Sequence, residues 1–134
     1  MASDRLRRDR AETIVVLDSS SILMVFEFSI DLEDELKRLL GRYKILVPKP
    51  IYDELVFLSI NGKGKKKLIA KPALELIKNY EISNAMGLAD DSVIYLANKN
   101  KGVVLTNDRD IRKKAKEKHL QTIYLRGKSK LVLE

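Results

Sequence analysis

Short apolar runs separated by helical stretches are the feature that most restricts how this chain folds. Residues 13–17, 45–47, 103–106 and 122–125 form such runs and are rich in β-branched side chains. Runs of this kind are typical of strands that are buried on both faces of a sheet. Because helical stretches lie between them, right-handed crossovers would make the sheet mostly parallel and cover both of its faces. We therefore predict a three-layer α/β/α fold with a mostly parallel central sheet.

The segments between these runs carry helix and turn signals. Asp18 and the serines that follow it form a helix start, because Asp and Ser oxygens cap free N–H groups. Pro50 fits the first turn of a helix, and Pro72 either kinks the helix around it or begins a second one. The sequence predicts helices at 22–28, 32–41, 51–59, 69–80, 89–98 and 108–118, further short strands at 81–83 and 130–133, and a basic loop at 61–67.

The length of 134 residues is typical of one domain. We assign residues 12–134 to this domain and interpret residues 1–11 as a flexible basic tail, because they are polar and have no periodicity. No apolar run approaches the ~20 residues of a membrane span. The first 12 residues also lack the apolar core of a secretion signal. We therefore expect a cytoplasmic protein without a membrane segment.

Composition limits the chemistry that the chain can perform. It contains no cysteine and one histidine. Disulfides, thiolate catalysis, cysteine-based zinc sites and metal sites with several histidines from one chain are therefore excluded. Acid–base or metal chemistry must rest mainly on Asp and Glu.

Four acidic residues lie near the carboxyl ends of predicted strands, where ligands bind in open α/β sheets. Asp18 follows the first strand, and Glu54 lies about one turn into the helix after the second. Asp91 lies in the first turn of a later helix, and Asp108 follows the strand after that helix. Each acid alone fits a helix start, but together they would repel one another unless a cation were present. Oxygen ligands without His or Cys select Mg²⁺ or Mn²⁺, so we predict one or two such ions.

The excess of basic side chains indicates a polyanionic partner. There are 26 Lys and Arg against 19 Asp and Glu, and the net charge is +7. Such a domain most often binds nucleic acid, with acidic proteins as the second possibility, although a basic solvated surface also occurs in thermostable proteins. Two clusters are candidates for phosphate contacts: Lys63, Lys65, Lys66 and Lys67 in the basic loop, and Arg109, Arg112, Lys113 and Lys116 on one side of the helix that follows Asp108.

Four motifs spread over most of the chain resemble the PIN-domain family of metal-dependent ribonucleases. They are VVLDSS at 15–20, PIYDEL at 50–55, ADDSVI at 89–94 and LTND at 105–108. The resemblance implies a sheet of order 3-2-1-4-5 and cleavage of single-stranded RNA with Mg²⁺ or Mn²⁺. It also implies an acidic site formed by Asp18, Glu54, Asp91 and Asp108.

Other residues of these motifs have supporting roles or are possible ligands by the same resemblance. The neighbouring acids Asp53, Asp90 and Asp110 fit a solvated surface or a supporting role better than direct ligation. This second set comprises Ser19, Asp90, Thr106, Asn107 and Asp110.

The leading hypothesis is an endoribonuclease that hydrolyses phosphodiester bonds in structured RNA or ribosomal RNA precursors. The pattern around Asp90 and Thr106 resembles the ribosomal-RNA-processing branch of the family, which includes archaeal members, more than the toxin branch. Ser20 replaces the Asn that the family usually has, which motivates a second hypothesis of a non-catalytic RNA-binding assembly module. The third is the toxin of a toxin–antitoxin pair. The family resemblance also allows a homodimer.

Overall fold

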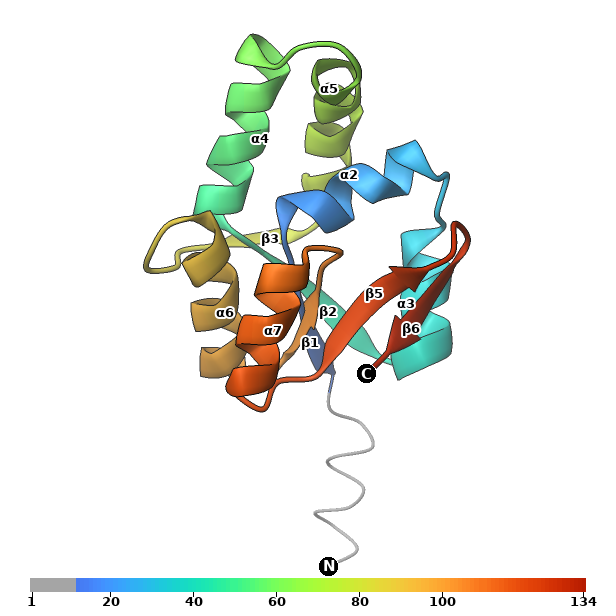
Figure 1. Ribbon diagram of the computed structural model, residues 1–134, viewed down its shortest axis with the longest axis vertical. Helices are drawn as coiled ribbons and strands as arrows, with labels where there is room; N and C mark the ends of the chain where they lie inside the picture. Colours follow the sequence, from blue (N-terminus) through green and yellow to red (C-terminus); the bar gives the residue numbers. More distant parts are fainter. Residues whose placement is uncertain (1–11) are drawn as a thin grey trace, which may run out of the picture.

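The computed structural model describes residues 12–134, which form a central sheet with helices packed around it (Figure 1). The tail predicted for residues 1–11 lies outside the described residues. The elements follow one another as β1 (Thr13–Leu17), α2 (Ser19–Glu27), α3 (Leu32–Leu40), β2 (Tyr43–Pro48), α4 (Lys49–Asn61), α5 (Lys65–Ile77), β3 (Glu81–Ser83), α6 (Ala89–Asn100), β4 (Val103–Leu105), α7 (Arg109–Glu117), β5 (Thr122–Arg126) and β6 (Lys130–Leu133).

The six strands lie in the order β3-β2-β1-β4-β5-β6. The first five pair in parallel, and β6 joins the edge of β5 in antiparallel orientation. This arrangement confirms the predicted three-layer α/β/α fold and the order 3-2-1-4-5, with the strand predicted at 130–133 added at one edge. The carboxyl ends of β1 and β4 are therefore neighbours, and the residues that follow these strands lie at the same end of the sheet.

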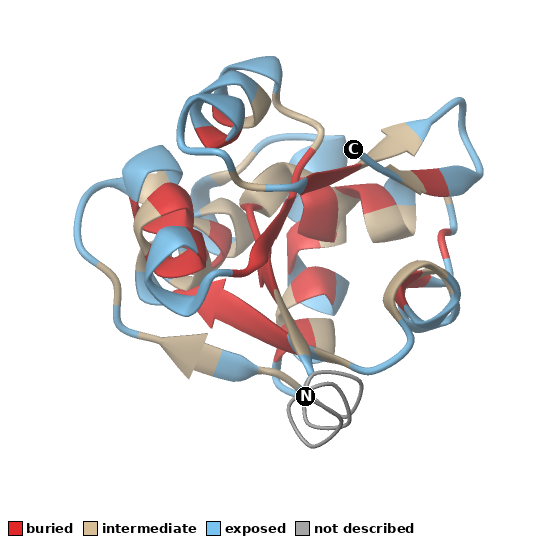
Figure 2. Cartoon of the chain, turned by 90° about the horizontal axis from the view of Figure 1, so that it is seen from below, coloured by how far each residue is buried: buried red, intermediate tan, exposed pale blue. Residues whose placement is uncertain are grey.

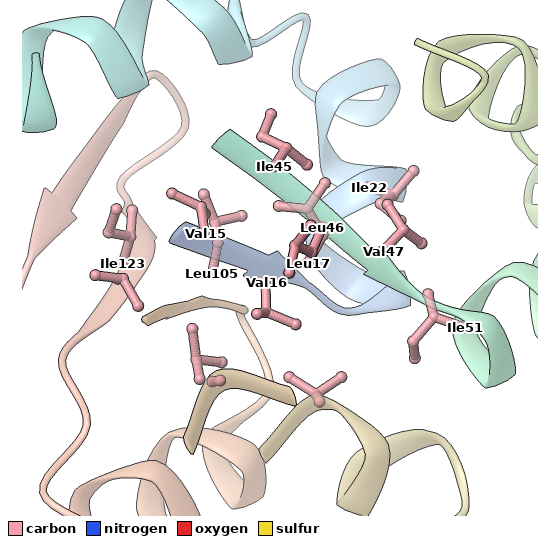
Figure 3. Packing of buried hydrophobic residues seen from close by; sticks show 14 of the residues in the cluster. Val15, Val16, Leu17, Ile22, Ile45, Leu46, Val47, Ile51, Leu105 and Ile123 are labelled. Atoms are coloured by element: carbon pink, nitrogen blue, oxygen red, sulfur yellow. The ribbon is translucent and has the colours of Figure 1, made fainter. Parts of the chain in front are cut away.

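The centre of the sheet forms the core of the protein. Val15, Val16 and Leu17 of β1 are fully buried, and Val15 and Val16 point to opposite sides of the strand (Figure 3). Helix α6 packs against β1, β2 and β4, while α3 packs against β2 and β6. Buried residues are concentrated on the strands and on the helix faces that meet them (Figure 2). Because both faces of β1 are covered, its sequence is a continuous apolar run rather than an alternating one.

The largest difference from the prediction concerns the basic loop expected at 61–67, of which only residues 62–64 are outside a helix. Helix α4 continues to Asn61 and α5 begins at Lys65, so residues 62–64 alone connect them. Lysine is well tolerated in helices, and Gly64 has a φ of 61°, in the region that favours glycine, just before α5 starts. The two helices form a hairpin that projects beyond the carboxyl end of the sheet (Figure 1).

Helix α5 is one element, because Pro72 lies inside it and does not begin a second helix. Pro72 lies on the exposed side of α5, where water can satisfy the carbonyl group that loses its intrahelical hydrogen bond. The other boundaries match the prediction or differ from it by up to four residues. The largest differences are at α5, which runs from Lys65 to Ile77 rather than over 69–80, and at α2, which starts at Ser19 rather than at 22. None of the helices described for residues 12–134 is both long enough and apolar enough to cross a membrane.

The α4–α5 hairpin offers a matched test of the core. Leu55 of α4 is fully buried, whereas Leu68 of α5 is 76% exposed. We expect Leu55→Ala to lower the free energy of unfolding by about 2–5 kcal/mol, because the substitution leaves a cavity in the core. We expect Leu68→Ala to change it by no more than about 0.5 kcal/mol. Urea denaturation followed by circular dichroism measures both, and equal losses would contradict this packing.

Candidate active site

Asp18 is the most enclosed acid of the predicted set. The residue is 2% exposed, and its Oδ1 accepts a hydrogen bond from the backbone N–H of Ser21 at 2.8 Å, which caps the start of α2. The Ser20 hydroxyl lies 2.9 Å and 2.8 Å from the two carboxylate oxygens, and Thr106 donates to Oδ2. Burial raises the pKa of the Asp18 carboxyl above its ordinary value, while the hydrogen bonds, that of Thr106 first, oppose this shift. A buried carboxyl of this kind is stabilised in its charged form by a nearby cation.

Ser20 and Thr106 connect the end of β1 to the end of β4. The Ser20 hydroxyl accepts a hydrogen bond from the backbone N–H of Asn107 at 3.1 Å. The Thr106 hydroxyl, which donates to Asp18, also accepts from the backbone N–H of Asp108 at 3.0 Å. The loops after two adjacent parallel strands are therefore fixed to one buried carboxylate.

Asp108 and Glu54 both lie close to this network, although they reach it by different routes. Asp108 is half-buried and caps α7, because its Oδ1 accepts from the backbone N–H groups of Asp110 and Ile111 at 2.8 Å and 3.2 Å. Glu54 lies in α4, and its Oε1 accepts a hydrogen bond from the Ser19 hydroxyl at 3.0 Å. Asp18 and Asp108 are thus joined by a short hydrogen-bonded path, and Glu54 contacts Ser19, the residue that follows Asp18.

Asp91 is the acid that stands apart from this network. It lies in the first turn of α6, its side chain is 69% exposed, and its Oδ1 is 3.5 Å from the Nζ of Lys114 on α7. Gly87 precedes this turn with a φ of 92°, and a Cβ there would lie 2.8 Å from the Cβ of Asp91. The chain therefore needs glycine at position 87, because any side chain would collide with the acid that follows it.

The four acids fit a divalent cation by donor type and by position in the fold. All offer carboxylate oxygens, the ligands that Mg²⁺ and Mn²⁺ prefer, and all follow strands at the carboxyl end of the sheet. Their side chains are not assembled around a common point: within residues 12–134, no three or more acidic or histidine side chains are placed to hold an ion together. Two of them, Asp18 and Asp108, act instead as helix caps.

The predicted supporting residues divide into an exposed group and a group that is half-buried or buried. Ser19 and Thr106 contact the acids directly. Asn107 serves the fold, because its Oδ1 accepts from the backbone N–H of Leu125 at 2.9 Å and so fastens the end of β4 to β5. The side chains of Asp90 and Asp110 are exposed.

The two basic clusters lie on different parts of the molecule. Lys63, Lys65, Lys66 and Lys67 are exposed at the end of the α4–α5 hairpin. Lys63 lies in the connection between the two helices, and the other three lysines begin α5. The cluster on α7 starts beside Asp108 and lines a cavity of about 430 Å³. The residues around this cavity are Arg109, Arg112, Lys113, Lys116 and Glu134.

Sequence reasoning missed two features of this region. Lys114 contacts Asp91 because α6 packs beside α7, and no spacing within the chain signals that contact. The guanidinium of Arg112 lies 3.7 Å from the centre of the Tyr124 ring, and the spacing of the basic stripe does not signal this contact. Both contacts depend on the way separate elements pack.

Similarity to known proteins agrees with the fold and with the order of the motifs. A family model described as a PIN like domain matches residues 15–128. Because this match covers most of the chain, the protein belongs to the PIN-like domain family.

Two curated archaeal proteins are similar along nearly their full length. Ribonuclease VapC4 of Methanocaldococcus jannaschii is 32% identical over 119 residues, which cover 85% of this chain and 91% of the relative. Ribonuclease VapC9 of Archaeoglobus fulgidus is 28% identical over 134 residues, which cover 100% and 98%. The solved structure of the PIN domain endonuclease Utp24 superimposes with a TM-score of 0.76 at 20% identity, covering 90% of each chain. The family prediction is confirmed, while the ribosomal-RNA-processing branch stays a prediction.

The Ser20 hydroxyl gives a test of the network around Asp18. We expect Ser20→Ala to lower the free energy of unfolding by about 1–3 kcal/mol, because the Asn107 N–H and the Asp18 carboxylate each lose a partner. Ser83→Ala is the control, since the Ser83 hydroxyl donates at 3.1 Å to the exposed Glu81 side chain. Denaturation in urea with EDTA present compares the two variants, and equal midpoints would contradict a stabilising role for Ser20.

Proposed function

We propose that this protein is a metal-dependent endoribonuclease that hydrolyses phosphodiester bonds of RNA. The observation that carries the proposal is the hydrogen-bonded path from Asp18 through Thr106 to Asp108, which sets two acids on the loops after adjacent strands. The basic surface beside Asp108 is suited to a polyanion. Family membership and two relatives named ribonucleases also support it.

Asp18, Asp91 and Asp108 would hold one or two Mg²⁺ or Mn²⁺ ions, with Glu54 as a further ligand or as the residue that positions the attacking water. A bound ion of this type lowers the pKa of water and neutralises charge that develops on phosphate. For Asp91 to join such a site, its carboxylate would exchange the contact with Lys114 for the cation.

The chain's own residues contribute orientation. Ser19 donates to one oxygen of Glu54 and leaves the other oxygen available to accept a proton or to orient a water molecule. Thr106 holds the Asp18 carboxylate and the Asp108 backbone in one arrangement, so both acids are positioned before substrate arrives. The cations of α7 start one residue after Asp108 and would attract the RNA backbone toward it.

The first test of the proposal is RNA cleavage by acid variants. We expect Asp91→Asn and Asp108→Asn each to lower the cleavage rate by about a hundredfold or more, because charge on the scissile phosphate is then less stabilised. Asn retains the ability to cap α7, so Asp108→Asn should still fold. Cleavage of labelled ribosomal-precursor and unrelated single-stranded RNAs, each with Mg²⁺ or Mn²⁺, measures the rates.

Asp53→Asn is the matched control for these variants. Asp53 directly precedes Glu54 in the sequence, but its side chain is exposed and pairs with Lys49. It should cleave at a rate near that of the original chain. Cleavage that persists in EDTA, or in both acid variants, would contradict the mechanism. A chain that binds RNA but cleaves none with either ion would favour the non-catalytic assembly module instead.

A second candidate function concerns the biological role of the same activity. The relatives named VapC share more sequence identity with this chain than Utp24 does. This similarity supports a second role, in which the ribonuclease is a toxin that a protein partner inhibits. The support for a toxin is about as strong as the support for ribosomal RNA processing. From the family resemblance we also propose that the purified protein forms a homodimer.

A toxin role predicts growth arrest when the chain is expressed alone in a bacterial host, since free ribonuclease would degrade cellular RNA. The neighbouring gene, when co-expressed, should relieve the arrest. Asp108→Asn should be harmless at the same expression level. Normal growth with a chain that cleaves RNA after purification would count against a toxin and favour RNA processing.

A further inference from the structure

The cavity on the outer side of α7 has the features of a built anion site. Four cations, Arg109, Arg112, Lys113 and Lys116, line it together with a single acid, Glu134. Their positions at i, i+3, i+4 and i+7 place them along one side of the helix over a rise of about 10 Å. A row of cations with this extension suits a chain of phosphates better than a single small anion.

The guanidinium of Arg112 lies at the wall of this cavity, against the ring of Tyr124. It lies 3.7 Å from the centre of that ring, which restricts the orientation of the guanidinium plane. The Nε of Arg112 is buried without a hydrogen-bond partner among residues 12–134. A guanidinium that is held in a fixed plane loses little entropy when its fork of N–H groups binds a phosphate.

Glu134 places a carboxylate among these cations. Its Oε1 lies 3.1 Å from the Nζ of Lys116, and its Oε2 accepts a hydrogen bond from the Tyr124 hydroxyl at 3.3 Å. The hydrogen bond with Lys116 lowers the pKa of the Glu134 carboxyl, so it stays charged at neutral pH. Two backbone hydrogen bonds with Thr122, at 3.1 Å and 2.8 Å, hold the Glu134 backbone in place. A rotation of the side chain would therefore be enough to vacate the cavity.

We propose that this cavity binds a phosphodiester group of the RNA substrate, and that the Glu134 carboxylate occupies it until RNA displaces the carboxylate. The proposal rests on the proposed ribonuclease function and extends it, because it fixes the direction in which the RNA strand leaves the acidic site. The strand would run from Asp108 along α7 toward Lys116. Glu134 lowers the affinity for RNA in this account, and Arg112 contributes more than its charge alone.

The decisive variant is Glu134→Gln, which removes the charge and keeps the shape. We expect RNA affinity to rise about threefold at low salt, and the plot of log affinity against log salt to become steeper by about one, since one more phosphate contact forms without competition. The control is Glu75→Gln. Glu75 also pairs with a lysine, Lys78, at 2.8 Å, but it lies on α5 and does not line the cavity. The control should change the affinity by less than about 1.5-fold.

Arg112→Lys tests the fixed guanidinium at constant charge. We expect RNA affinity to fall about fivefold, because lysine has no planar fork and stacks less well on Tyr124. Fluorescence anisotropy with a labelled single-stranded RNA in EDTA measures all variants of the full chain without cleavage, and thermal melting checks their folding. If Arg112→Lys does not fold, the comparison of the two glutamate variants decides alone.

Equal gains for Glu134→Gln and Glu75→Gln would overturn the proposal, because a general change in net charge would then explain both. Affinity unchanged by Glu134→Gln, or unchanged by a folded Arg112→Lys, would also overturn it. The binding assay contains no metal, so its result is independent of whether the acids cleave RNA. A positive binding result with a chain inactive in Mg²⁺ and Mn²⁺ would therefore reject the catalytic function alone.

Discussion

Burial of the Asp18 carboxylate at the end of β1 is the constraint on which the site depends. The carboxylate of a residue that is 2% exposed requires hydrogen-bond partners, and Ser20, Ser21 and Thr106 supply them. The same contacts start α2 and join the β1 and β4 ends. One acid therefore serves as a structural cap and as a proposed ligand, so the fold and the site cannot be altered independently there.

The opposing charges of the molecule are arranged in a way that suits a polyanionic substrate. Carboxylates lie at the carboxyl end of the sheet, and the α7 cations begin next to Asp108. Two ion pairs partly neutralise these groups within the chain. Lys114 pairs with the carboxylate of Asp91, and Glu134 pairs with the cation of Lys116. We infer that these pairs limit repulsion in the free protein and exchange for a cation and for RNA when these bind.

The fold was predictable from sequence because its strongest signals are local. Apolar runs such as VVL at 15–17 mark strands, and Asp18 marks a helix start by its capping chemistry. The basic loop at 61–67 was misjudged because two glycines outweighed the helix-forming lysines beside them. The Lys114–Asp91 and Arg112–Tyr124 contacts were inaccessible to sequence reasoning, since each joins elements whose spacing only the packed structure sets. Positions of the acids at the strand ends followed from the motifs, whereas the conformations of their side chains did not.

A crystal structure of the chain soaked in Mn²⁺, with anomalous diffraction data collected to locate the ion, tests the central claim most directly. The account predicts manganese bound by carboxylate oxygens of Asp18 and Asp108, with the Asp91 side chain turned away from Lys114 toward the ion. Crystals that contain no manganese at these acids, or that hold it only elsewhere on the surface while Asp91 still contacts Lys114, would contradict it.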